Sequence, residues 1–220
     1  PEFPGLNLSR EVLDAQATRT KDGTAPPPLL ETQVVDAADS IAYDTHDADD
    51  AIELGLVSLE ELLELPLVAE AATRVRDRLG PLGDGDLRRA VIHELVDFQV
   101  AELVRTSLAR LRGLGIRSVA EVRAAGTAPE RRMIGHTPAV AAAKRDLERF
   151  LFTRVYRSER VLAVRVPAQQ RLVEVFDWYT AHADQLPPRF QERAAAFGVP
   201  RSTADYIAGM TDRFLEREHA

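Results

Sequence analysis

The apolar residues of this chain recur mainly at the three- and four-residue spacings of amphipathic helices. The clearest pattern covers residues 86–112, whose apolar positions are Ile92, Leu95, Val96, Val100, Leu103, Val104, Leu108 and Leu111. A second long helix is predicted for residues 29–54, with Gly55 following as a C-terminal cap. The sequence contains no alternating strand pattern, no repeat of fixed period and no low-complexity segment. The pattern therefore predicts an all-α fold.

Local start and stop signals set the other boundaries in the first part of the chain. Ser58 and Glu61 form a capping box, in which a helix-starting Ser is followed three residues later by Glu. Gly and Pro residues predict a loop over residues 19–28 and a break over residues 80–85. The helices predicted before that break cover residues 7–18, 29–54, 58–66 and 67–79. We expect the break to divide the chain into two regions, residues 1–79 and 80–220.

Proline and hydroxyl residues set the boundaries in the second region. Thr137 followed by Pro138 is typical of a helix start, with Pro in the first helical position. Pro167 is predicted to begin the next helix, because proline is tolerated in the first turn of a helix and disrupts its interior. Ser202 is predicted to cap the final helix. The predicted helices cover residues 86–112, a short stretch after Ser118, and residues 138–164, 167–183 and 202–213.

The composition excludes several classes of protein. Hydrophobic residues make up 45% and charged residues 29% of the 220 positions, which is typical of a globular protein and not of a disordered one. A net charge of −7 argues against nucleic acid as a partner. The sequence has no continuous apolar stretch long enough for a membrane span and no secretion signal at its start, so we expect a cytoplasmic setting. Cysteine is absent, which leaves His, Asp and Glu as metal ligands.

The helix predicted for residues 29–54 carries a row of acidic residues. Asp39, Tyr43 and Asp47 follow an i, i+4, i+8 spacing and lie on one face. Such a row is ordinarily the solvated face of an amphipathic helix, and that interpretation stays open. This face, however, has no Lys or Arg partner one turn away, and Asp weakens a helix interior. Clustered carboxylates attract a cation, and carboxylate and imidazole ligands suit Mg, Mn, Fe, Co or Zn.

Four segments in the same order carry a family resemblance. They are Phe3-Pro-Gly-Leu-Asn-Leu-Ser9, Glu31 to Asp50, Phe150-Leu-Phe-Thr-Arg-Val-Tyr-Arg157 with Arg160-Val161, and Asp205-Tyr-Ile-Ala-Gly-Met-Thr-Asp-Arg213. Together they resemble the deoxyguanosine-triphosphate triphosphohydrolase family of HD-domain phosphohydrolases. The resemblance spans nearly the whole chain. It implies the C-terminal part of an HD-domain helical core, ending near residue 79, followed by a helical extension.

The resemblance also implies roles for individual residues. Asp39 corresponds to the last metal ligand of the family, whose metal is a divalent ion such as Mg or Mn. Tyr43 and Asp47 correspond to residues that face the deoxyribose of the substrate. Arg154 and Tyr156 are candidates for binding its polyphosphate. The implied reaction is hydrolysis of a deoxynucleoside triphosphate to deoxynucleoside and triphosphate.

The sequence also departs from the family pattern. The family holds its metal with a His, a His-Asp pair and a distant Asp, but the only His-Asp pair here is His46-Asp47, inside the last segment. We therefore expect the first three ligands upstream of Pro1, assign no catalytic residue within this chain, and expect the isolated chain to be inactive. Thr18-Arg19 and the run from Tyr156 to Arg160 also differ from the family, which affects the expected triphosphate contacts.

Two further expectations follow from these observations. The broad apolar stripes of the helices beyond residue 84 predict a homo-oligomer. The alternative to an enzyme is a catalytically silent module for nucleotide sensing or oligomerisation, and the presence or absence of upstream His and His-Asp ligands would separate the two.

Overall fold

The all-α prediction is confirmed by the computed structural model, which describes residues 6–17, 28–124 and 132–219 and contains no strand among them. The described part forms two compact units, residues 1–155 and 156–220. The predicted loop over residues 19–28, the Thr18-Arg19 departure and the start of the Phe3–Ser9 segment lie largely outside the described residues. None of the described helices is both long enough and apolar enough to cross a membrane.

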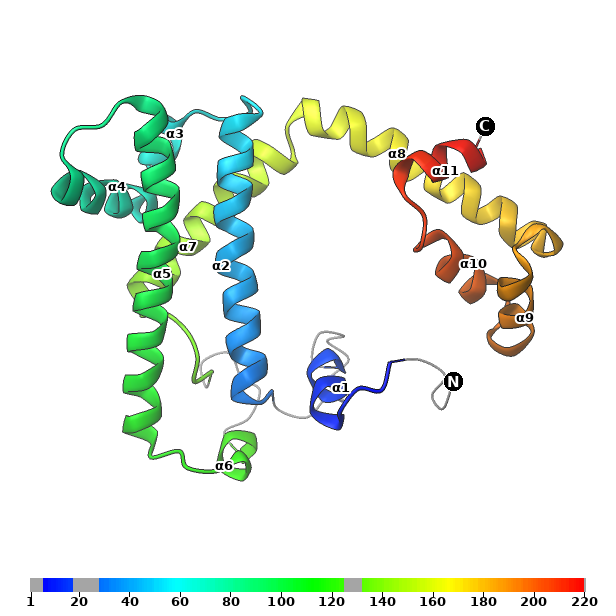
Figure 1. Cartoon of the computed structure of the whole chain (residues 1–220), viewed down its shortest axis with the longest axis horizontal. Coiled ribbons are helices and arrows are strands. Elements are labelled where there is room, and N and C mark those ends of the chain that lie inside the picture. Colours follow the sequence, from blue (N-terminus) through cyan, green and yellow to red (C-terminus); the bar gives the residue numbers. More distant parts are fainter. Residues whose placement is uncertain (1–5, 18–27, 125–131, 220) are drawn as a thin grey trace. The chain divides into compact units, whose positions relative to one another are not determined.

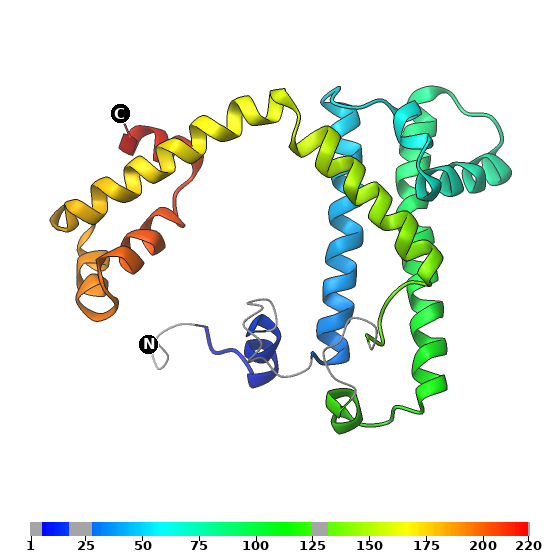
Figure 2. The ribbon, with the colours of Figure 1, turned by 180° about the vertical axis from the view of Figure 1, so that it is seen from behind.

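The first unit is built around two long helices. α2 (Leu30–Glu53) and α5 (Asp84–Leu114) lie side by side and run in opposite directions (Figure 1). α7 (Pro138–Leu151) crosses both helices on the side that faces the viewer in Figure 2. The other helices of this unit are α1 (Arg10–Ala17), α3 (Leu59–Leu63), α4 (Pro66–Leu79) and α6 (Val119–Ala124).

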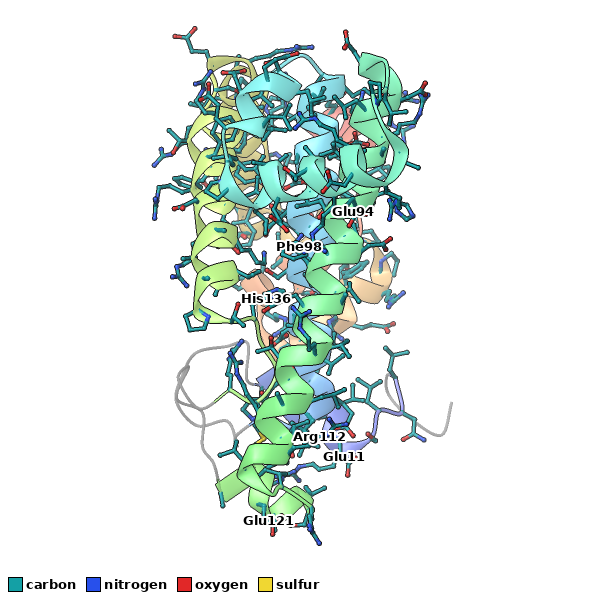
Figure 3. The ribbon with its side chains drawn as sticks, turned by 90° about the vertical axis from the view of Figure 1, so that its left-hand side faces the viewer. Glu11, Glu94, Phe98, Arg112, Glu121 and His136 are labelled. Carbon is teal, nitrogen blue, oxygen red and sulfur yellow. The ribbon has the colours of Figure 1, made fainter. Side chains whose placement is uncertain are left out.

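Apolar side chains from α2, α4, α5 and α7 fill the core of this unit. The fully buried ones include Ile41, Ala48, Leu67, Val68, Val75, Val91, Leu95, Leu147 and Leu151. α4 packs against α5, where the Arg74 guanidinium lies 4.4 Å from the centre of the Phe98 ring and Arg78 pairs with Glu94 at 2.9 Å (Figure 3). These contacts cross the predicted break at residues 80–85 and lie within one unit. The proposed end of the HD core near residue 79 stays a prediction.

Several predicted helix ends are confirmed in detail. Ser58 and Glu61 form the reciprocal capping box that begins α3, with hydrogen bonds of 2.8 and 3.2 Å. The Thr137 side chain accepts a hydrogen bond from Val140 N at the start of α7. Gly55 follows α2 in the left-handed region with φ of 64°, which suits glycine because it lacks a Cβ. The short-range signals thus predicted these boundaries correctly.

The second unit begins at Tyr156, the last residue of the π-helical turn that follows α7. A π-helical turn (Phe152–Tyr156) follows α7 and leads into α8 (Glu159–Ala181), η3 (Ala183–Gln185), α9 (Pro188–Phe197), α10 (Val199–Ile207) and α11 (Asp212–His219). Val175, Tyr179, Leu186 and Ile207 form its buried core, and Phe176, Phe190, Tyr206, Met210 and Leu215 pack around them.

Three predicted boundaries beyond residue 137 were wrong. Pro167 lies inside α8, which begins earlier because the Ser158 side chain accepts a hydrogen bond from Val161 N. The predicted helix over residues 138–164 therefore ends at Leu151 instead. Ser202 is a buried residue within α10, and its hydroxyl donates to the Phe190 carbonyl at 2.6 Å. The predicted final helix is divided between α10 and α11, which begins only at Asp212.

Candidate active site

The predicted acidic row forms on α2. Asp39, Tyr43 and Asp47 belong to one uninterrupted helix, and their spacing places them along one face of it. Asp39 is exposed, Tyr43 is 57% exposed and Asp47 is partly buried. The helix is fixed from its other side by the core residues Ile41 and Ala48, so the row faces away from the core. The three side chains are therefore accessible to a ligand.

The protonation of two groups in this row is shifted by their surroundings. Partial burial raises the pKa of the Tyr43 hydroxyl, and the nearby carboxylates of Asp47 and Asp44 raise it further. Burial also raises the pKa of Asp47, as does the charge of Asp50, while His46 acts in the opposite direction. Tyr43 therefore keeps its proton at neutral pH and can donate a hydrogen bond.

The described residues do not by themselves form a metal centre. No group of three or more His, Asp or Glu side chains close enough to hold an ion occurs in residues 6–17, 28–124 and 132–219. Asp39 can contribute one carboxylate oxygen, whereas a catalytic divalent ion generally takes about three protein ligands. The fit to a metal is thus limited to a single ligand from this chain.

The residues predicted to bind polyphosphate are positioned differently. Arg154 lies in the π-helical turn and forms an ion pair with Glu61, whose other oxygen belongs to the α3 capping box. A phosphate approaching Arg154 would compete with this carboxylate. Tyr156 is the first residue of the second unit and is partly buried. The structure therefore groups Asp39, Tyr43 and Asp47 on one element and leaves the roles of Arg154 and Tyr156 as predictions.

A buried ion pair behind the acidic row escaped the sequence analysis. Lys144 on α7 is 7% exposed and binds the Asp44 carboxylate, which is 5% exposed. The same ammonium donates to the Ser40 carbonyl at 3.3 Å and to Glu148 at 3.0 Å. Burial raises the pKa of Asp44, and the Lys144 ammonium opposes that shift. This contact fixes α2 against α7 directly next to Tyr43.

A second buried polar contact holds α2 to the segment before α7. Gln33, which is 6% exposed, accepts hydrogen bonds from the backbone N–H groups of Met133 at 3.0 Å and Ile134 at 3.3 Å. Its amide nitrogen donates to the Pro28 carbonyl at 3.1 Å. Gln33 therefore satisfies backbone groups that would otherwise be buried without a partner.

The same segment is fixed from α5 by Glu102, which is 2% exposed. Glu102 accepts hydrogen bonds from Thr137 N and the Thr106 hydroxyl, both at 2.9 Å, and lies 2.5 Å from Nδ1 of His136. His136 lies beside α5 (Figure 3). Burial alone would raise the pKa of Glu102, but these hydrogen bonds together hold that pKa below its ordinary value near 4.5.

Glu102→Gln is expected to make the folded state less stable at neutral pH by about 1–3 kcal/mol, because a charged acceptor for three donors is lost. The pKa of Glu102 is lower in the folded chain than its ordinary value near 4.5, which applies to the unfolded chain. Such a carboxyl stabilises the fold fully at pH values above 4.5. This stabilisation is lost as the pH falls below the pKa of Glu102 in the folded chain. The difference between the variant and the unchanged chain should therefore shrink at acidic pH. Urea unfolding at pH 7 and below pH 4.5 measures it, and an equal difference at both pH values would contradict the prediction.

Comparison with known proteins places this geometry in context. Residues 134–220 match the family model of the phosphohydrolase-associated domain. The match begins two residues before His136 and covers α7 and the whole second unit.

Three curated relatives are similar over nearly all of the chain, and each is named a deoxyguanosinetriphosphate triphosphohydrolase-like protein. The relative from Deinococcus deserti is 38% identical over 100% of this chain and 56% of its own length. The relative from Geobacter sulfurreducens is 34% identical over 97% of this chain and 57% of its own length. One from Deinococcus radiodurans is 36% identical over 100% and 58%. The chain therefore spans little more than half the length of these relatives.

Proposed function

Because the chain belongs to the deoxyguanosinetriphosphate triphosphohydrolase-like family of HD-domain phosphohydrolases, and corresponds to its C-terminal portion, we propose that the complete protein hydrolyses deoxynucleoside triphosphates. The products would be the deoxynucleoside and triphosphate. The observation that carries this proposal is the accessible row of Asp39, Tyr43 and Asp47 on α2. Along the helix, Asp39 offers a metal ligand, Tyr43 a flat aromatic ring and Asp47 a hydrogen-bond acceptor.

We assign Asp39 to a divalent metal such as Mg or Mn, with the remaining ligands supplied from outside this sequence. When bound, the metal would activate a water and polarise a phosphoryl oxygen. Asp47 lies two turns from Asp39, about 12 Å along the helix axis, which is too far to share one ion. It would instead accept a hydrogen bond from the sugar 3′-hydroxyl, with Tyr43 packing against the sugar ring between them.

We further propose that Arg154 and Tyr156 bind the polyphosphate of the substrate. An arginine fork can donate two parallel hydrogen bonds to phosphate oxygens. Substrate binding would require Arg154 to exchange its Glu61 carboxylate for phosphate. The exposed Val100, Val104 and Leu108 of α5 support the further proposal that the complete protein is a homo-oligomer.

Asp47→Asn in the complete protein is expected to weaken substrate binding by about 1–3 kcal/mol while leaving the metal content unchanged. The apparent KM should rise, and the preference for substrates over their 3′-deoxy analogues should fall. Steady-state kinetics and elemental analysis measure both effects. Glu31→Gln, at an exposed acid in the first turn of the same helix, is the matched control and should change neither. Loss of metal from Asp47→Asn would overturn the assigned role.

A second candidate function is a catalytically silent module for nucleotide sensing or oligomerisation. It is favoured by the exposed apolar residues Val100, Val104 and Leu108 of α5, which suit contact with a second chain. The 220-residue chain alone is expected to release no triphosphate in either case, which makes it the negative control. The two functions differ in the complete protein with Mn or Mg, where only the enzyme releases triphosphate above a heat-inactivated sample.

A further inference from the structure

An open pocket of about 1120 Å³ lies between α2, α5, α7 and the segment of residues 132–137. Asp39, Tyr43 and Asp47 are not among its lining residues. Part of its wall is apolar and is formed by Leu103 and Leu114 of α5, Ile134, and Ala141 of α7. Its volume is slightly above the usual range of about 300–1,000 Å³ for small-molecule sites, so it can hold a ligand larger than a single phosphate.

The charged part of the pocket lining is mainly cationic, although the chain as a whole carries a net charge of −7. Arg110, Arg132 and Arg145 come from three different elements and line the same pocket. Among the described lining residues, Asp36 is the one carboxylate. Lys144 also lines the pocket, but its charge is balanced by Asp44 and Glu148. The three arginines therefore produce a local excess of positive charge.

Arg110 is held in a defined position. Its guanidinium donates a hydrogen bond to the His136 carbonyl, and this bond uses one of the five N–H donors of the arginine. At Gly135 an added Cβ would lie 2.9 Å from Nη1 of Arg110, so a side chain there would displace the guanidinium or the segment. Gly135 N in turn donates to Ser107 at 3.1 Å. A segment fixed in this way, together with the bonds from Gln33 and Glu102, gives the pocket a preorganised rim.

We propose that this pocket binds a small organic phosphate. The phosphate oxygens would lie between Arg110, Arg132 and Arg145, because the arginine fork matches phosphate geometry better than any other side chain. The nonpolar portion of the ligand would lie against Leu103, Leu114 and Ile134. Asp39, Tyr43 and Asp47 do not line this site, and the proposal does not rest on the proposed hydrolytic function.

The test is calorimetric titration of the 220-residue chain, without divalent metal, with phenyl phosphate and with inorganic phosphate. Phenyl phosphate should bind at least several-fold more tightly, because its ring contacts the apolar wall. Arg145→Ala should weaken phenyl phosphate binding by about five- to tenfold, since a charge-assisted contact is lost. Arg132→Ala is the second variant and should act in the same direction.

Arg149→Ala provides the matched control. Arg149 lies one turn beyond Arg145 on α7, pairs with Asp146 at 3.0 Å and does not line the pocket. Circular dichroism of each variant establishes that it is folded. Failure of the unchanged chain to bind phenyl phosphate would overturn the proposal, as would equal losses in Arg145→Ala and Arg149→Ala. Equal affinities for phenyl phosphate and inorganic phosphate would overturn the role of the apolar wall.

Discussion

Asp39→Ala is expected to abolish hydrolysis of deoxynucleoside triphosphates by the complete protein and to lower its content of divalent metal. Asp39 is the only ligand that the acidic row is proposed to contribute, and removing one carboxylate from a small ligand set weakens the site strongly. Because Asp39 is exposed on α2 and lies outside the buried core, its replacement should leave the fold intact. Triphosphate release and elemental analysis of the same preparation measure the two effects together.

Asp50→Ala provides the control for this experiment. Asp50 is also exposed on α2, so it matches Asp39 in residue type and helix. Its replacement should keep both metal and turnover. If Asp39→Ala keeps both as well, the proposed metal role of this residue is wrong.

Lys144→Met is expected to destabilise the first unit by about 3–5 kcal/mol, because it leaves the buried Asp44 carboxylate without its partner. The Ser40 carbonyl loses a donor in the same substitution. Methionine has a similar shape, so the effect reports the lost charge and hydrogen bonds and not a cavity. Denaturant unfolding followed by circular dichroism measures the change in the free energy of unfolding.

Two comparisons make the origin of this effect clear. Arg149→Met removes a cation from an exposed pair with Asp146 on the same helix, and should cost less than about 1 kcal/mol. Replacing Lys144 and Asp44 together by Met and Leu should recover most of the stability, because no charge is then left buried alone. Equal costs for Lys144→Met and Arg149→Met would contradict a structural role for the buried pair.

The sequence predicted the elements whose signals are local. The apolar period of α5, the capping box at Ser58 and the Thr137 cap depend only on residues within a few positions of one another. The i, i+4, i+8 row on α2 is local in the same sense. Pro167 was misinterpreted because a proline inside a helix costs stability by removing a hydrogen bond to the residue four positions earlier. That residue, Ala163, is exposed in α8, so water can satisfy its carbonyl.

The buried polar contacts could not be predicted in this way. Asp44 resembles the other acids of α2 in sequence, and only its position against Lys144 distinguishes it. Gln33 and Glu102 likewise gain their roles from backbone groups of the segment before α7. Ser202 could equally begin a helix or lie within one, and its contact with Phe190 decided between them. Each case depends on tertiary contacts that helical periodicity does not contain.

The distance along the chain between α2 and its buried partners has a consequence during protein synthesis. Gln33 and Met133 are 100 positions apart, and so are Asp44 and Lys144. At a translation rate of about 5–20 residues per second, α2 leaves the ribosome about 5–20 s before these partners do. During that interval Gln33 and Asp44 cannot form these two buried contacts. α2 therefore acquires these native contacts late, after α7 has been made.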